Sequence, residues 1–371
     1  PRNRARRVRR ESPRRSRGDP RIFLSWSWGN VAPEMIRCKW ITGILRRIGY
    51  ITGKKKGGAI MYELVQAGER SWYIESPAKI GICLLDDGGV CLIDSGLDRE
   101  AGKRALKILD AQHWRLRAVV NTHSHADHIG GNRLLQERTS CPIFATAFET
   151  AFARHPILEP ALVYGGFPPA PLRGKFLLAQ PSPVREITDP EFPRELRTIP
   201  LPGHWFDMVG VRSPDGTLFL ADALASEVVL AKYRIPFIYD FRAYLATLDE
   251  LEKLDAPFFV PSHAPATADI GPLVRVNRAA VTALLERIAA LCAEKPHGFE
   301  EILKRLFDEF GLVLDFTQYA LAGSTIRSAL AFLGDSGRIA AGFEANRLLW
   351  RACPDQASMP EEVRSSERSM S

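Results

Sequence analysis

Three of the eight histidines in this chain of 371 residues lie within one stretch of six residues, from His123 to His128. The residues just before it, 117–121, have the apolar and β-branched character of a buried strand. In a loop that leaves such a strand, His123 and His125 face one side, while Asp127 and His128 turn towards a neighbouring point. Imidazole nitrogens and carboxylate oxygens are common ligands of zinc, iron and manganese. The sequence therefore predicts a metal site at the end of this strand.

Other polar residues also stand just past the ends of predicted strands. They are Asp94 after a strand over 90–93, His204 after 196–201, Asp222 after a hairpin over 209–220, and His263 after 258–261. Since rigid strands present the side chains at their ends into one cleft, we expect these residues to lie together at a common sheet edge.

The pattern of strands and helices falls into two β-rich halves. The first half has strands at 61–66, 71–75, 80–85, 90–93, 117–121 and 142–146, and helices at 98–113, near 128–136 and at 148–154. The second half adds a helix at 241–254 to its strands. Two such halves predict an α/β fold in which two sheets pack face to face and helices cover the outside. Residues 156–183 and 224–240 are expected to be loops that wall the binding pocket.

Cysteine usage and hydropathy indicate a protein of a reducing compartment. The six cysteines include no CxxC pair, so we expect buried, reduced thiols, with Cys83 and Cys91 on either side of a turn at 86–89. No apolar run reaches the roughly 18 residues of a membrane-spanning helix. The basic N-terminal region is not followed by the apolar stretch and cleavage site of a secretory signal. We expect a cytoplasmic protein without a membrane partner.

The positive charge of the chain is concentrated near its start. Residues 1–60 contain 17 Lys and Arg against three Asp and Glu, so the net charge of +7 leaves the remainder at −7. An Arg-rich stretch with few apolar residues is typical of disorder. We interpret 1–60 as a basic, disordered extension, which is either dispensable or upstream sequence included in the chain. A disordered tail is expected at 353–371.

Five sequence elements, in the order in which they occur along the chain, resemble those of the metallo-β-lactamase superfamily. The residues from His123 to His128 reproduce its HxHxDH motif, and Pro202-Gly203-His204 is similar to its second metal segment. The other three similar elements are Ile93-Asp94-Ser95-Gly96, Asp222 and His263. The resemblance covers about residues 61–268 and implies a four-layer αββα catalytic domain of the glyoxalase II-like or lactonase-like group.

The resemblance also implies a role for each residue. One metal ion would be bound by His123, His125 and His204, a second by Asp127, His128 and His263, with Asp222 between the two. The implied cofactor is a pair of zinc ions, with iron or manganese as alternatives, and a metal-bound hydroxide would attack an ester-like carbonyl. Asp127 would also act as the catalytic partner for the proton of the nucleophile. Asp94 would orient a ligand from behind the site.

The C-terminal residues 272–352 are predicted to form a helical module. An amphipathic helix over 272–293 precedes helices at 299–310 and 316–333 and a hairpin over 337–351, an order that resembles a winged helix. Residues 294–352 contain seven Lys and Arg against eight Asp and Glu, so the basic surface of a nucleic-acid reader is absent. We expect a lid, a substrate-shaping module or a dimer contact instead, which leaves a homodimer open.

The leading hypothesis is hydrolysis of a small-molecule thioester, lactone or related ester. Trp205, Phe206 and Asp207 follow His204 where glyoxalase-like proteins usually have a small hydroxylic residue, and no basic cluster for glutathione is evident. The alternatives are a non-haem iron oxygenase of the persulfide dioxygenase type and a nucleic-acid-processing member of the same fold. The full set of seven ligands argues against the mononuclear dioxygenase.

Overall fold

The computed structural model describes residues 62–353. The predicted basic extension at 1–60 and, apart from its first residue, the predicted tail at 353–371 lie outside the described residues.

The first sheet has seven strands in the order β1-β2-β3-β4-β5-β6-β7. The strands are β1 (Glu63–Gln66), β2 (Ser71–Glu75), β3 (Ile80–Leu84), β4 (Val90–Ile93), β5 (Leu116–Val120), β6 (Ile143–Ala145) and β7 (Arg185–Glu186). Strands β1 to β4 pair antiparallel, and the pairs from β4 to β7 are parallel. Cys83 lies opposite Cys91 across β3 and β4, which confirms the predicted turn between them.

The second sheet has four strands in the order β11-β10-β9-β8. The strands are β8 (Arg197–Pro200), β9 (Val209–Arg212), β10 (Leu218–Phe219) and β11 (Phe259–Val260). Phe219 from this sheet packs in one buried cluster with Ile93 and Phe144 from the first sheet. The predicted sheet-on-sheet core is therefore present.

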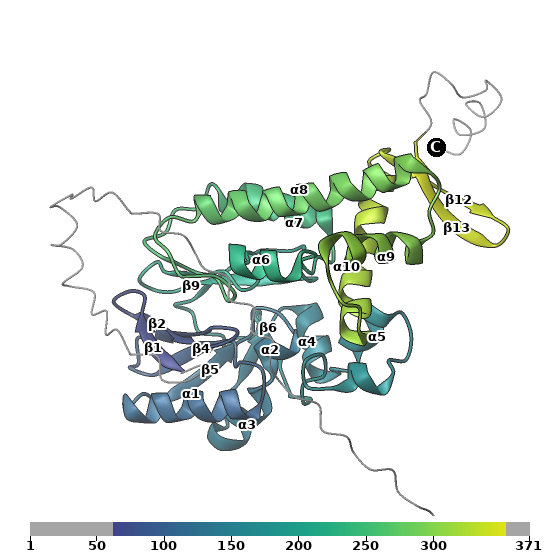
Figure 1. The fold of residues 1–371 in the computed structure, drawn as a ribbon. Helices are drawn as coiled ribbons and strands as arrows, with labels where there is room; N and C mark the ends of the chain where they lie inside the picture. Colours follow the sequence, from purple (N-terminus) through teal and green to yellow (C-terminus); the bar gives the residue numbers. More distant parts are fainter. Residues whose placement is uncertain (1–61, 354–371) are drawn as a thin grey trace, which may run out of the picture. The chain divides into compact units, whose positions relative to one another are not determined.

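Helices cover the outer face of each sheet (Figure 1). On the first sheet, α1 (Arg99–Ala111) and α3 (Asn132–Thr139) bury Leu109 and Leu135 against the strands. On the other side, α7 (Phe241–Leu251) and α8 (Gly271–Glu294) share a large hydrophobic cluster with Leu218 of the second sheet, and α6 (Glu227–Tyr233) packs against α8. The two sheets and these outer helices form the four layers of an α/β sandwich. Of the described helices, none is both long and apolar enough to cross a membrane.

The expectation of loops at 156–183 and 224–240 was wrong in part, because both segments contain helices. After α4 (Ala147–Arg154), the chain forms α5 (Leu158–Tyr164) and a short 3-10 helix (Ala170–Arg173), and α6 lies within 224–240. Helix α5 ends at Gly165, whose φ of 80° suits glycine, and it packs against a C-terminal helix. This tertiary contact stabilises a helix too short to be evident from Pro- and Gly-rich sequence.

The predicted C-terminal elements occur close to their predicted positions. They are α8, α9 (Phe299–Phe310), α10 (Phe316–Asp335), β12 (Ile339–Glu344) and β13 (Arg347–Ala352). Ile326 and Leu330 of α10 belong to the same buried cluster as Trp205 and Phe241. The C-terminal helices thus pack directly on the second half of the sandwich.

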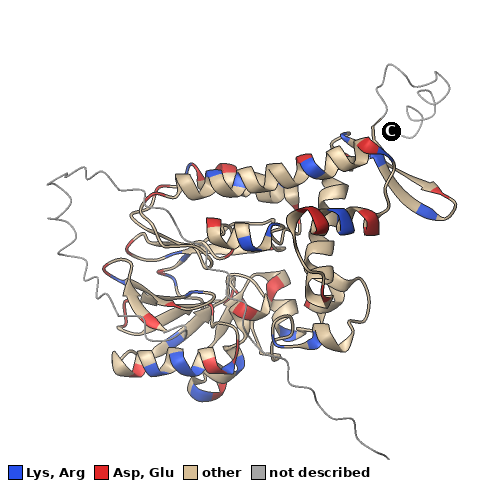
Figure 2. Cartoon of the chain, viewed as in Figure 1, with Lys and Arg blue, Asp and Glu red and all other residues tan. Residues whose placement is uncertain are grey.

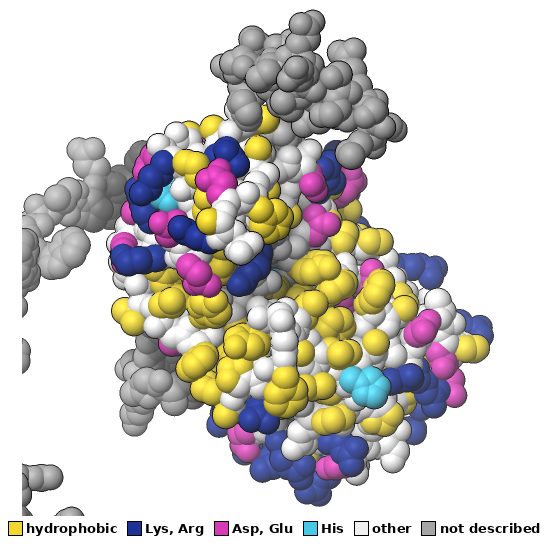
Figure 3. Space-filling view, turned by 90° about the vertical axis from the view of Figure 1, so that its right-hand side faces the viewer, with side chains coloured by type: hydrophobic (Ala, Val, Ile, Leu, Met, Phe, Trp, Pro, Cys, Tyr) yellow, Lys and Arg dark blue, Asp and Glu magenta, His cyan; other side chains and the backbone are white. Residues whose placement is uncertain are grey.

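One face of the molecule carries many exposed hydrophobic side chains (Figure 3). On α5, Leu162 is 43% exposed, and the 3-10 helix that follows contacts α10. Phe316, the first residue of α10, is 53% exposed. The outer layer of helices is therefore not uniformly polar.

Phe219 is expected to be critical for the packing of the two sheets. Its ring fills the space beside Gly81, where an added Cβ would lie 2.6 Å from the ring. We predict that Phe219→Ala lowers the free energy of unfolding by about 3–5 kcal/mol, because a large cavity replaces a buried ring. Denaturant unfolding measures this, with Phe343→Ala, at an 81% exposed ring, as the matched control. Equal and small effects of both substitutions would contradict the packing described.

Candidate metal centre

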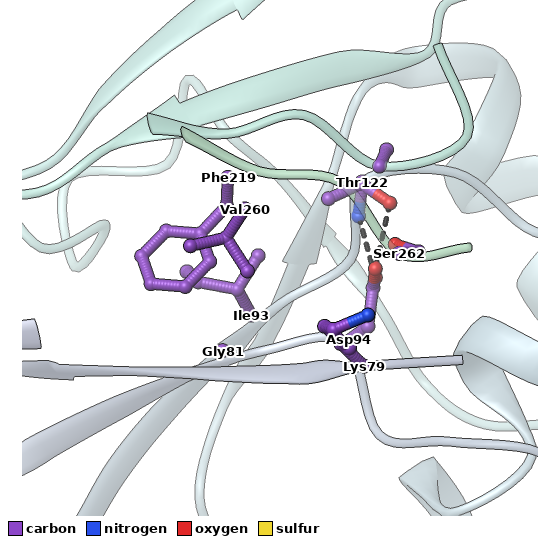
Figure 4. Close-up of a pocket in the computed structure, with 9 residues that line it drawn as sticks. Lys79, Gly81, Ile93, Asp94, Thr122, Phe219, Val260 and Ser262 are labelled. Atoms are coloured by element: carbon purple, nitrogen blue, oxygen red, sulfur yellow. Dashed lines mark hydrogen bonds between the residues drawn. The ribbon is translucent and has the colours of Figure 1, made fainter. Parts of the chain in front are cut away.

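The loop that carries the predicted ligands leaves β5 and enters helix α2 (Ala126–Ile129). Asp94, just after β4, holds this loop with both carboxylate oxygens. Its Oδ1 accepts a hydrogen bond from the backbone N–H of Thr122 at 2.8 Å, and its Oδ2 accepts one from the Thr122 hydroxyl at 2.8 Å. Figure 4 shows both bonds at a small cavity that is also lined by Lys79 and Ser262. The two bonds fix the start of the loop relative to the first sheet.

Three histidines meet at the first of two candidate ligand clusters. The Nδ1 atom of His125 lies 3.1 Å from Nε2 of His123 and 3.1 Å from Nε2 of His204. His204 reaches this point from the turn after β8, in the second sheet. The structure thus brings together the three residues that the sequence assigned to one metal ion.

Four further side chains form the second cluster, beside the first. Asp222 lies between its two histidines, with Oδ1 3.1 Å from Nε2 of His128 and Oδ2 3.2 Å from Nε2 of His263. Nε2 of His263 is also 3.3 Å from Oδ2 of Asp127. Oδ2 of Asp222 is 3.6 Å from Nε2 of His204, so this carboxylate connects both clusters. All seven predicted residues therefore gather at one place.

Hydrogen-bond acceptors fix the orientation of three imidazole rings: His204 in the first cluster, and His128 and His263 in the second. The Nδ1 atoms of His204 and His263 lie 3.0 and 2.9 Å from the backbone carbonyl oxygens of Phe237 and Pro77. The Nδ1 atom of His128 lies 2.8 Å from Oδ2 of Asp94. Carbonyl and carboxylate oxygens only accept, so each Nδ1 carries a proton. In the neutral ring, Nε2 then presents its lone pair to the cluster.

The tautomer of His123 is fixed in the same way, through the hydroxyl of Thr122. Its Nδ1 lies 3.1 Å from the hydroxyl of Thr122, which already donates its proton to Asp94. The hydroxyl can therefore only accept from Nδ1, and Nε2 of His123 is left with a lone pair. Asp94 thus sets the tautomer of His123 and of His128 at once.

The histidines of the two clusters differ in the direction in which their pKa values are shifted. Burial, together with the neighbouring imidazoles, holds the pKa of His123 well below its usual range and lowers that of His125 to about 3. Burial also disfavours charge on His263, but Asp222 and Asp127 outweigh it and raise the pKa to about 10. The carboxylates at the second cluster therefore attract positive charge, which is a proton when no cation is bound. Metal binding at such a site releases that proton.

The donor set fits a pair of divalent cations. Among the described residues, Nε2 of His128 and Oδ1 of Asp222 are buried and have no hydrogen-bond partner, although they lie close together. Nε2 of His125 is unpaired as well. Unpaired buried polar atoms are unfavourable, and a cation between His128 and Asp222 would satisfy both of their atoms. A set of imidazole nitrogens and carboxylate oxygens, without thiolates, is typical of zinc, iron or manganese centres.

Glu149, at the start of α4, was not predicted from the sequence to support the site. Its side chain is fully buried, and its oxygens accept hydrogen bonds from the backbone N–H groups of Ser124 at 2.9 Å and Asp207 at 3.1 Å. It therefore ties the 121–128 loop to the loop that carries His204. Burial raises the pKa of Glu149 to about 7. Its only sequence signal is a carboxylate among the apolar residues of a short helix.

Lys79, just before β3, supports the other side of the centre. Its Nζ donates to the backbone carbonyl of Ala264 at 2.8 Å and lies 3.3 Å from a carboxylate oxygen of Glu75. Its side chain is only 7% exposed. Lys79 therefore fixes the loop that carries His263, and no motif in the sequence indicated this role. The remaining described histidines, His113, His155 and His297, belong to neither cluster.

Asp94→Asn tests the role of the acceptor behind the rings. An amide that accepts from Thr122 turns its NH2 group towards Nδ1 of His128 and favours the tautomer with a proton on the metal side. We predict a loss of metal affinity of about 10-fold to 100-fold, measured by chelator competition. Asp98→Asn, at the N-cap of α1, is the control and should change only stability. Unchanged affinity in Asp94→Asn would show that the acceptor has no influence.

This chain is similar to known proteins in sequence and in fold. Residues 82–263 match the family model of the metallo-beta-lactamase superfamily. A hydroxyacylglutathione hydrolase from Methylococcus capsulatus is 28% identical over 210 residues, which cover 54% of this chain and 69% of that protein. Another from Nitrobacter hamburgensis is 28% identical over 227 residues, covering 58% and 78%.

Two solved structures show the same fold. A beta-lactamase domain protein from Burkholderia ambifaria has a TM-score of 0.63 at 18% identity and covers 83% of this chain and 98% of its own. A metallo-beta-lactamase family protein from Thermus thermophilus has a TM-score of 0.58 at 21% identity, with 76% and 98% covered. These matches cover more of the chain than residues 82–263, so the shared fold includes elements outside that range. We conclude that this chain carries a metallo-beta-lactamase superfamily domain, which spans residues 82–263.

Proposed function

We propose that this protein is a binuclear metallo-hydrolase that cleaves an ester-like bond, and that thioesters are its most favoured substrates. The main support for the proposal is that seven N and O donor groups lie together. In four of the histidines, an acceptor bonded to Nδ1 leaves the lone pair of Nε2 facing the cluster. The similarity to proteins named hydroxyacylglutathione hydrolases, a name that refers to an acyl group carried by glutathione, supports a thioester over the other ester-like bonds.

Two zinc ions would be held by the two clusters. His123, His125 and His204 would hold one ion, and Asp127, His128 and His263 the other, with Asp222 as a ligand available to both. When bound, such ions acidify a water molecule and stabilise negative charge on a carbonyl oxygen. The acceptors behind the rings keep the ligands in place without reorganisation during the reaction.

Substrate approaches this centre from the side of Asp127 and His263. The side chains of Asp127 and His263 are 33% and 25% exposed, whereas His123 and His128 are fully buried. The charged histidines around Asp127 outweigh its burial and hold the pKa of its carboxyl well below the usual range. As an ionised acceptor, Asp127 can orient the attacking water and carry its proton towards the leaving group.

We propose that the winged-helix-like C-terminal module shapes the substrate site rather than binding nucleic acid. Thr325 of α10 accepts a hydrogen bond from the backbone N–H of Ile238 at 3.2 Å, next to the carbonyl of Phe237 that orients His204. Basic and acidic side chains alternate over α8 and α9 (Figure 2). One example is Arg287, paired with Glu309. Such neutralised charges favour a small-molecule substrate over a polyanion.

Asp127→Asn is the direct test of the proposed hydrolysis. The amide keeps the shape of the side chain but is a poor proton acceptor, so we predict a loss of kcat of about 100-fold to 10,000-fold on thioesters, lactones and esters. Thermal unfolding should show a retained fold. Asp249→Asn, at an exposed ion pair with Arg278, is the matched control and should keep full activity. A wild-type protein that cleaves RNA but none of these substrates would overturn the proposed function.

A further inference from the structure

A continuous row of aromatic rings extends from the metal centre to the protein surface. We define this aromatic row by its five members, Phe237, Trp205, Tyr239, Phe206 and Phe148. The ring of Phe237 begins the row, with its centre 5.3 Å from that of His125 and 5.5 Å from that of His204. Phe148 ends the row at the surface, where it is 55% exposed.

Successive rings of the row are in contact. Trp205 is 5.7 Å from Phe237 and 5.8 Å from Tyr239, measured between ring centres. Tyr239 is stacked on Phe206 at 4.1 Å, and Phe206 is 5.6 Å from Phe148. Trp205 is fully buried, whereas Phe237, Tyr239 and Phe206 are half-buried and so keep part of their ring surface open.

Hydrogen bonds fix the row relative to the metal centre. The indole N–H of Trp205 donates to the hydroxyl of Ser124, within the 121–128 loop, at 3.0 Å. The backbone N–H of Tyr239 donates to the carbonyl of Gly203 at 3.0 Å, next to His204. Rings held in this way lose little conformational entropy when they bind an apolar group.

The position of Asp127 indicates which part of the substrate lies along the row. In hydrolysis, a water oxygen forms a bond to the carbonyl carbon, the C–S or C–O bond breaks, and the leaving atom receives a proton. The second cluster is the more open of the two, since the side chains of Asp127 and His263 are partly exposed, and a leaving group has room on that side. Phe237 lies beside the first cluster, against His125 and His204, which leaves that side for the acyl group.

From this arrangement we propose that the aromatic row binds the acyl part of the substrate, and that the substrates are thioesters or esters with extended apolar acyl groups, aliphatic or aromatic. This proposal rests on the proposed hydrolase function. The row offers ring surfaces and no charged group; its indole N–H is already bonded to Ser124, and its one other polar group is the hydroxyl of Tyr239. A charged acyl group would lose its hydration there without gaining a charged partner.

A series of thioesters with one constant thiol and acyl groups from acetyl to decanoyl tests the proposal. For the zinc-loaded wild type we expect kcat/KM to rise by up to roughly fourfold per methylene until the row is covered. In Phe206→Ala and Phe237→Ala the rise should largely disappear, mainly through KM. Phe206→Leu should keep most of it, and the control Phe343→Ala should keep it fully.

The outcomes separate this proposal from the hydrolase function. Turnover of all members at equal kcat/KM would overturn the aromatic row as an acyl site and leave the hydrolase intact. No turnover of any member would overturn the hydrolase function. In that case, calorimetry with decanoate tests whether the aromatic row binds an acyl chain. Binding that is weaker in Phe206→Ala, and unchanged in Phe343→Ala, would support the proposed acyl site, whereas no binding to the wild type would overturn it.

Discussion

Each imidazole ring has two nitrogens, and the acceptor bonded to one of them decides whether the other can bind a cation. In this protein that acceptor is a carboxylate for His128, a carboxylate-bound hydroxyl for His123, and a backbone carbonyl for His204 and His263. Without these bonds the rings could rotate or change tautomer, and their lone pairs would no longer face a common point. The positions of the acceptors therefore determine whether the seven side chains can bind a cation.

The acceptors come from parts of the chain that only the fold brings together. Asp94 lies at the end of β4, Pro77 lies between β2 and β3, and Phe237 lies after α6. The segment around Phe237 is in turn held by Thr325 of α10. The C-terminal helices thus reach the candidate metal centre through two hydrogen bonds, and they also share a hydrophobic core with the second half of the sandwich.

The seven residues of the two clusters could be predicted from the sequence because each follows a strand or a turn with a recognisable pattern. The ends of strands in a sandwich meet at one edge, so local patterns were enough to expect that these residues gather. The supporting residues could not be predicted in the same way. Glu149 and Lys79 act on backbone groups of distant loops, and their roles depend on tertiary contacts that leave no periodic signal. Helices α5 and α6 escaped prediction for a related reason, since packing stabilises them more than their own propensity does.

The central claim is that these seven side chains form one centre for two cations. Anomalous diffraction from crystals grown with zinc tests it most directly. The account predicts two peaks about 3.5–4 Å apart, one at about 2.1 Å from the facing nitrogens of His123, His125 and His204 and the other equally close to those of His128 and His263. A single peak, or zinc bound away from Asp222, would contradict it.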